Sequence, residues 1–343
     1  MTRISMIGLD LAKNVFQVHG VDVDGVVVVR RQLRRSQVEK FFAELPPTLV
    51  GLEACGSAHH WARLIGSYGH EVRLMPAGYV KAYVKRNKND GRDAEAICEA
   101  LSRPTMRFVP VKSVEQQAVL SVHTTRSLLV RQRTMAANAL RAMLSEIGIV
   151  AAQGIKGLRE LMSKLDQPDV VVPDLMRDAL RMLARQWQAL DEAERMLERQ
   201  IKQAAAADPN ARRLMEVPSV GPIIASAALA KVADPHVFRS GRDFAAWIGL
   251  TGRDRGTGGK PRPGPISKQG DRMLRALLIC GASAYLRQAR RRGITDPWLR
   301  ALLARRPYKV VMVALAARTA RIIWAMLATG QHYRDRARLP AQA

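Results

Sequence analysis

Short apolar and β-branched runs bounded by turn residues, the pattern that predicts buried strands, recur through residues 1–100 of this 343-residue chain. We expect strands at 5–10, 14–18, 26–29, 48–53 and 71–75. Helices are expected at about 36–45, 57–68 and 93–102, the first with Ser36 as its N-cap. Three strands joined by turns, followed by alternating strands and helices, predict a mixed α/β domain.

Beyond residue 111 the pattern is helical. One helix is expected from about 113 to 146. Between Met176 and Ile201 apolar residues recur at alternating spacings of four and three, which is the heptad pattern of a helix–helix seam, interrupted at Glu194. This pattern predicts a long helical hairpin or coiled coil, and a plain helical bundle fits it almost as well. The seam also offers a dimerisation surface.

The chain after Asp208-Pro209 predicts a second, mostly helical domain. Residues 214–226 resemble a helix-hairpin-helix element, whose turn around Pro218 and Gly221 would present backbone N–H groups to a phosphate; a plain helical connection is the alternative. We therefore expect four parts: an α/β domain at 1–108, a helical coiled-coil region at 109–207, a mostly α C-terminal domain at 208–332 and a basic tail at 333–343.

Basic residues far outnumber acidic ones. The 55 Lys and Arg against 30 Asp and Glu give a net charge of +25. The excess is strongest from residue 251 onward, where 20 Lys and Arg face four acidic residues. A surplus of this size indicates a polyanionic partner, nucleic acid first and an anionic membrane second.

Nothing in the pattern indicates a membrane or secreted protein. The apolar run at 310–317 is followed by Arg318 and Arg321, which makes it too short to span a bilayer. Three scattered cysteines and the lack of a signal-like N-terminal segment favour the cytoplasm. We expect no membrane partner.

Four carboxylates stand out against the basic background. Asp10 and Glu53 each end an apolar strand, whereas Asp90 and Asp93 lie three residues apart at the start of a helix. If the two strands are neighbours, these groups converge and repel one another, which a divalent cation relieves. This indicates a Mg²⁺ site, with Mn²⁺ as a substitute. Singly, Asp93 fits an N-cap and Glu53 a salt-bridge partner.

The order strand–Asp, two strands, strand–Glu, then Asp at a helix is the layout of an RNase H-like, or RuvC-like, nuclease domain. Segments 7–10, 52–56 and 89–94, together with 217–222, 244–251 and 266–271, resemble the motifs of the DEDD insertion-sequence transposases. These are also called bridge-RNA-guided recombinases, and the pilin-gene invertase is a relative. The resemblance covers nearly the whole chain in order.

This resemblance implies DNA recombination. The carboxylates would map to Asp10, Glu53, Asp90 and Asp93, holding Mg²⁺, while a serine of the C-terminal domain would attack a phosphate and form a covalent protein–DNA link. A structured bridge RNA would pair with both donor and target DNA. The family forms tetramers, so a homo-oligomer, dimer or tetramer, is expected at the bacterial nucleoid.

The nucleophile is where the chain departs from its relatives. The glycine-rich stretch 255–260 that would carry the serine contains none. Thr257 in that stretch and Ser267 beside Lys268 are the candidates; the alternatives are a loop residue for Thr257 and a helix N-cap for Ser267. An inactivated copy is a third possibility.

Basic side chains on two segments are expected to contact nucleic-acid phosphates, which fixes register without reading sequence. They are Arg126, Arg131 and Arg133 on the first long helix, and Lys260, Arg262, Lys268, Arg272 and Arg275 in the C-terminal domain.

Two other functions share some of these features. A metal-dependent junction-resolving endonuclease needs the carboxylates but no protein nucleophile. A non-catalytic nucleic-acid-binding protein needs only the positive charge, with the acids serving as caps and salt bridges.

Overall fold

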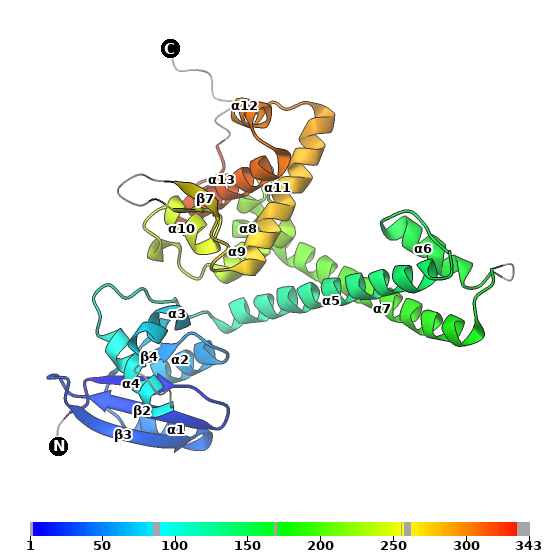
Figure 1. Ribbon diagram of the computed structural model, residues 1–343. Helices are drawn as coiled ribbons and strands as arrows, with labels where there is room; N and C mark the ends of the chain where they lie inside the picture. The colour runs from blue at the N-terminus through cyan, green and yellow to red at the C-terminus, as the bar shows by residue number, and fades with distance from the viewer. Residues whose placement is uncertain (1–2, 85–89, 168–169, 255, 257–261, 335–343) are drawn as a thin grey trace, which may run out of the picture. The chain divides into compact units, whose positions relative to one another are not determined.

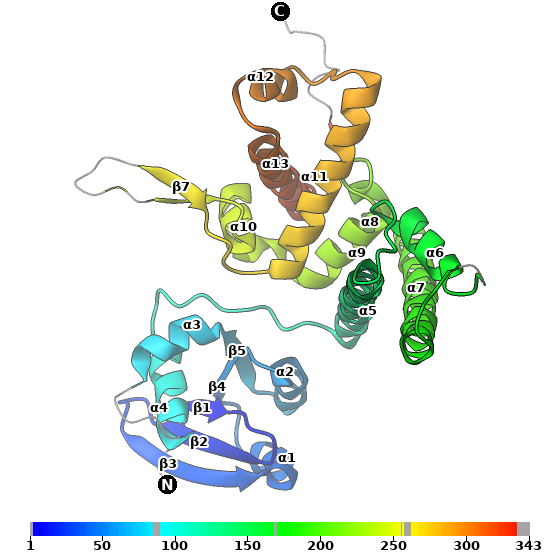
Figure 2. The ribbon, with the colours of Figure 1, turned by 45° about the vertical axis from the view of Figure 1, so that its right-hand side comes forward.

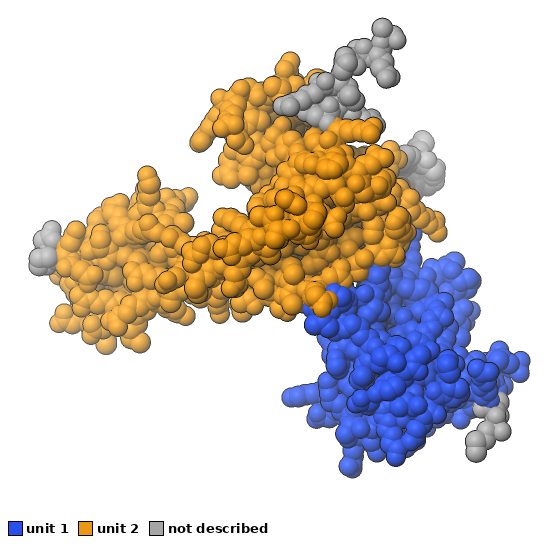
Figure 3. All heavy atoms as spheres, turned by 180° about the vertical axis from the view of Figure 1, so that it is seen from behind, with its two compact units in different colours: residues 1–114 blue, residues 115–343 orange. Residues whose placement is uncertain are grey.

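The computed structural model describes residues 3–84, 90–167, 170–254, 256 and 262–334. The chain divides into two compact units, Met1–Val114 and Glu115–Ala343 (Figure 3). The first boundary therefore falls six residues after the expected one. The helical middle region and the C-terminal region, expected as separate domains, form one unit.

A five-stranded mixed sheet is the centre of the first unit (Figure 1). Its strand order is β3-β2-β1-β4-β5, in which β1 is antiparallel to β2 and parallel to β4. All five expected strands are present, and β3 runs on through its arginines because it is an edge strand whose polar side chains are exposed. The strands are β1 Met6–Asp10, β2 Val15–Val21, β3 Val27–Arg34, β4 Leu49–Glu53 and β5 Glu71–Met75.

Helices cover both faces of this sheet (Figure 2). On one face α1 and α2 pack against Leu9 and Leu52, and on the other α4 packs against Met75. The helices are α1 Arg35–Ala43, α2 Ala58–Ser67, the short α3 Ala77–Val80 with the 3₁₀ turn η1 Lys81–Tyr83, and α4 Asp90–Leu101.

Two helix starts differ from the expectation. The N-cap of α1 is Arg34, not Ser36. The Gln37 side chain, at the third position of the helix, accepts a hydrogen bond of 2.8 Å from the Arg34 N–H, which fixes the start of the helix at Arg35. Helix α4 begins at Asp90, so Asp93 lies inside the first turn and is not its N-cap.

The second unit begins with a long helical hairpin, visible in Figure 1 as α5 and α7. The expected apolar seam is buried at Leu180, Trp187 and Ile201, but two acidic side chains, Asp191 and Glu194, are buried within it. Its helices are α5 Val114–Ser145, α6 Ile155–Lys164 and α7 Asp174–Ala207.

The remainder of the second unit is a helical domain with one small hairpin. Its core is formed largely by α9, α10, α11 and α13. The hairpin β6–β7 was not expected from the sequence, since its glycine and proline residues mask the strand pattern. The elements are α8 Pro209–Leu214, α9 Pro222–Lys231, the 3₁₀ turn η2 Pro235–Val237, α10 Gly241–Ile248, β6 Gly252–Asp254, β7 Pro263–Ile266, α11 Arg272–Arg292, α12 Pro297–Arg305 and α13 Tyr308–Thr329.

Within the described part of the chain, α13 is the one helix whose length and apolar composition would allow it to cross a membrane. One side of α13 is buried in the C-terminal core, at Val311 and Leu315 among others. Arg318 of the same helix forms a 2.6 Å ion pair with Asp296 and lies over the Trp298 ring. These contacts are those of a core helix.

His123 joins the long hairpin to the helical domain. It is buried, and its Nε2 forms a 3.0 Å hydrogen bond with the Ser226 hydroxyl of α9. Burial, with the charges of Arg126 and Lys231, lowers the pKa of His123 to about 4.

This pKa predicts acid sensitivity. The unfolded chain takes up the His123 proton near its ordinary pKa of 6.5, so the stability present above that pH is lost as the pH falls toward about 4. We expect His123→Gln to lose less stability than the parent between about pH 7 and about pH 5. Denaturant unfolding at both pH values measures the difference, and equal losses would contradict the assignment.

Candidate active site

Asp10 and Glu53 are the last residues of two neighbouring parallel strands. Strands β1 and β4 are paired in register up to Leu9 and Leu52, so the next residue on each strand is one of the two carboxylates. Both are partly buried. The structure thus brings these two predicted residues together at one edge of the sheet.

Helix α4 covers the face of the sheet that carries both carboxylates. Side chains alternate along a strand, so Asp10 shares a face with Gly8, and Glu53 with Gly51. A Cβ at Gly8 would collide with the carbonyl oxygen of Ala94 on α4, so only glycine lets the helix approach this closely. The first turn of α4 is therefore held against β1, close to the strand end.

Asp93, the third predicted carboxylate, lies in that first turn, one residue before Ala94. Its Oδ1 atom is buried, and the residue shares a helix face with the buried Ile97. Asp90 is the first residue of α4, but its side chain lies outside the described part of the structure. Among the described side chains, no three His, Cys, Asp or Glu residues form a group that could hold a metal ion.

The negative charges of this edge also act on the thiol of Cys55. Burial raises the pKa of Cys55, and the negative charges of Glu53 and Asp10 raise it further. Both carboxylates therefore act on the same point just beyond the strand ends. Carboxylate oxygens gathered at one edge are the donors that Mg²⁺ and Mn²⁺ prefer, so the residues present fit such a cation.

Ser267, the described nucleophile candidate, follows β7. Its N–H donates to the Thr251 carbonyl (2.9 Å), and its hydroxyl accepts a 3.4 Å hydrogen bond from the Gln269 N–H. It is not an N-cap: Asp271 caps α11, because its carboxylate accepts from the Leu274 N–H at 2.8 Å. Thr257 and Lys260 lie outside the described residues.

The loop that follows Ser267 is tightly constrained. Lys268 has a φ of +57°, a left-handed conformation that non-glycine residues rarely adopt. Gly270 approaches α10 so closely that a Cβ would collide with the Trp247 carbonyl oxygen. Arg253, which the sequence pattern did not single out, donates from its guanidinium to the Ser267 carbonyl oxygen at 3.0 Å. Arg253 lies on β6 and Ser267 follows β7, so their contact depends on a hairpin that the sequence did not predict.

The predicted phosphate-contacting residues divide into two groups. Arg126 and Arg133 are largely buried in ion pairs within the hairpin, and Arg275 donates to the carbonyl oxygens of Ile248 and Gln269 at 2.6 and 2.8 Å. These three side chains are engaged in contacts within the protein, and their contact with phosphates stays a prediction. The exposed members are Arg131, Arg262, Lys268 and Arg272.

The helix-hairpin-helix-like segment is the turn between α8 and α9. Its Ser219 is buried, with its hydroxyl hydrogen-bonded to that of Thr319 at 2.6 Å. Gly281 of α11 packs against the Ser219 carbonyl, whereas Gly221 faces open space. Phosphate binding at this turn stays a prediction.

Comparison with known proteins finds one family match for the N-terminal group of sequence motifs and another for the C-terminal group. Residues 7–149 match the DEDD-type transposases of IS110 elements, and residues 211–303 match the transposase family named for IS116, IS110 and IS902. A protein of Pseudomonas aeruginosa named "Probable family 20 transposase" is 51% identical, over 97% of this chain and 99% of its own length.

Two further relatives are named as transposases of particular elements. The transposase for insertion sequence element IS1111A of Coxiella burnetii is 40% identical, over 97% of this chain and 92% of its own length. The transposase for IS1328 of Yersinia enterocolitica is 38% identical, over 96% and 98%. With these matches across nearly its whole length, the chain belongs to the IS110 family of insertion-sequence transposases, enzymes that cleave and rejoin DNA.

Proposed function

We propose that this transposase cleaves and rejoins DNA at a divalent-metal site formed by Asp10, Glu53, Asp90 and Asp93 in an RNase H-like domain. The observation that carries the proposal is the register of β1 and β4, which ends both strands in a carboxylate on the face covered by α4. Mixed strand order and helices on both faces support the domain assignment.

Mg²⁺, or Mn²⁺ in its place, would supply Lewis-acid stabilisation of the charge that develops on a scissile phosphate. The contribution of the chain is to hold carboxylates at fixed positions. Asp10 and Glu53 are fixed by the paired strands, and the close packing of α4 on Gly8 fixes the turn that carries Asp93. Such preorganised oxygen donors are the feature this chemistry needs.

The nucleophile would be the hydroxyl of Ser267 or Thr257 in the C-terminal region. Its oxygen would attack phosphorus and displace one DNA oxygen, which leaves as a hydroxyl and can later attack the covalent link to rejoin the strand. Ser267 is supported by its well-defined loop and by the neighbouring Arg253 guanidinium. Arg131, Arg262, Lys268 and Arg272 would contact phosphates of donor and target DNA.

A structured bridge RNA is the proposed guide, and a dimer or tetramer the proposed assembly. The net charge of +25 supports a large polyanionic partner. Sequencing the RNA that co-purifies with the protein from its native locus tests the guide. Recovery of no discrete RNA derived from the element would contradict it.

The covalent step is tested with an element-end DNA substrate and Mg²⁺. We expect a protein–DNA adduct that survives denaturation in the parent protein. It should be lost in either Ser267→Ala or Thr257→Val, and the variant that loses it identifies the nucleophile. Cleavage without any adduct would instead identify a metal-dependent endonuclease, and an adduct in both variants would exclude both hydroxyls.

A further inference from the structure

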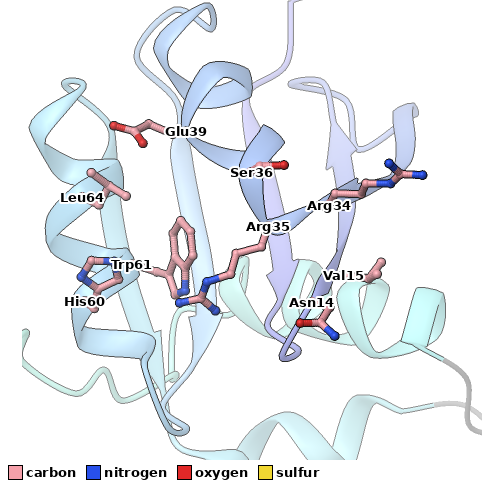
Figure 4. A pocket seen from close by; sticks show the side chains of 9 residues that line it. All are labelled: Asn14, Val15, Arg34, Arg35, Ser36, Glu39, His60, Trp61 and Leu64. Carbon is pink, nitrogen blue, oxygen red and sulfur yellow. The ribbon is translucent and has the colours of Figure 1, made fainter.

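A second feature of the first unit is a shallow groove of about 770 Å³ between α1 and α2 (Figure 4). It lies beside the start of β2 and the end of β3. Trp61 forms part of its wall and packs against the α1–α2 face of the sheet, not the face that carries Asp10 and Glu53. Polar side chains lining it include Asn14, Arg34, Arg35, Ser36 and His60.

Trp61 is the unusual residue of the groove. Its side chain is 4% exposed, and its indole Nε1 is buried without a hydrogen-bond acceptor among the described residues. The ring is held edge-to-face by Phe16, with 4.9 Å between ring centroids. A buried donor without an acceptor costs about 1–3 kcal/mol, so a fixed ring in this state indicates that a ligand supplies the missing acceptor.

Arginine side chains lie close to this ring, and the Arg35 guanidinium also donates to the Lys13 carbonyl oxygen at 3.3 Å. The Arg35 guanidinium lies 5.0 Å from the Trp61 ring centroid, on the same side as the indole nitrogen in Figure 4. Arg34 is exposed at the rim, and both arginines lie at the N-terminus of α1, where the helix dipole favours an anion. The carboxylate of the groove, Glu39, accepts a 2.7 Å hydrogen bond from the Tyr68 hydroxyl.

We propose that this groove binds a phosphodiester group of a nucleic-acid strand, with Arg35 and the Trp61 N–H as the donors. The inference rests on the proposed function, since it needs a nucleic-acid partner, but it adds a contact separate from the carboxylates. Arg35 and Phe16 cover the indole ring, which leaves no open face on which a base could stack. The contact therefore positions a strand without reading its sequence.

The position of the groove suits such a role. Its Asn14 is four residues beyond Asp10, after the turn that joins β1 to β2, and the Asn14 carbonyl accepts from the Arg35 N–H at 2.8 Å. A nucleic-acid strand held in the groove would therefore contact residues that follow Asp10 closely along the chain. The groove itself lies on the opposite face of the sheet from the carboxylates.

The test measures binding of the full chain to a fluorescein-labelled single-stranded RNA and to a labelled duplex DNA, each at several salt concentrations. We expect Arg35→Gln to weaken binding about fivefold to tenfold and to lower the salt-dependence slope by about one, because one phosphate contact is lost. Trp61→Phe keeps the ring and removes only a neutral donor, so we expect about threefold weaker binding with an unchanged slope. The probe whose affinity falls in these variants identifies the bound strand as RNA or DNA.

Lys40→Gln is the matched control, since Lys40 is a highly exposed cation of the same helix that does not line the groove. If the parent binds both probes and Arg35→Gln behaves like Lys40→Gln, the groove assignment is wrong while the proposed function stands. If the parent binds neither probe, the groove assignment is wrong, and the metal-site proposal is judged by the Asp10→Asn cleavage assay. Arginine-specific chemical labelling of the unmutated protein gives a second measurement: the probe should protect Arg35, and an unchanged labelling rate would overturn the proposal even if Trp61→Phe does not fold.

Discussion

Asp10→Asn is expected to reduce DNA strand cleavage by about a hundredfold to a thousandfold, the scale of loss seen when one group that stabilises transition-state charge is removed. The substitution is isosteric and removes one negative charge. Asp10 lies at the end of β1, so the paired strand should be unaffected. DNA binding should be retained or slightly strengthened, because the edge becomes less negative. Cleavage of an element-end DNA in Mg²⁺, with binding measured in parallel, checks the prediction.

Glu53→Gln should give the same phenotype, because Glu53 occupies the equivalent position on β4. Asp24→Asn is the control: Asp24 is an exposed carboxylate of the β2–β3 turn, so the same chemical change there should leave cleavage unaltered. Full activity in Asp10→Asn and Glu53→Gln would end the metal-site proposal and favour a non-catalytic role for both carboxylates.

The position of each carboxylate at the end of an apolar strand could be predicted because it depends on local patterns, whereas the adjacency of the two strands is only a condition of the sequence-based prediction. A parallel pair of short apolar strands has few possible registers, since a one-residue shift would turn Leu9 and Leu52 away from the core. The close approach of α4 could not be predicted from Gly8 alone. A glycine within a strand is compatible with a bulge or a close helix contact, and only the three-dimensional structure shows which one occurs.

The hairpin arginines show what charge alone does not predict. Arg133 lies within a basic stretch of α5, and a basic stretch on a helix normally faces solvent. Its partners, Asp191 and Glu194, are 58 and 61 residues away in sequence, on a different helix. The interruption of the apolar seam at Glu194 was the available signal. An acidic residue at a seam position needs a basic partner across the interface, and α5 offered several candidates.

This ion-pair cluster leads to the second large expected effect. Arg133 lies 2.6 Å from a carboxylate oxygen of both Asp191 and Glu194, which are 9% and 6% exposed. We expect Arg133→Met to destabilise the hairpin by about 3 kcal/mol, because it leaves two buried like charges one helical turn apart. Arg126 still pairs with Glu194, and Arg195 with Asp191, which limits the loss. Hydrogen exchange of α5 and α7 amides in the full chain measures the change.

Arg131→Met is the matched control, because Arg131 is exposed on the same helix and its loss should change stability little. Adding Asp191→Asn and Glu194→Gln to Arg133→Met should restore more than half of the lost stability, since the neutral amides no longer repel each other. The rescue separates a charge effect from a packing effect: if Arg133→Met destabilises and the triple variant is no better, the side-chain stem rather than the guanidinium stabilises the hairpin. Equal exchange rates in Arg133→Met and Arg131→Met would show that the cluster contributes little to the stability of the hairpin.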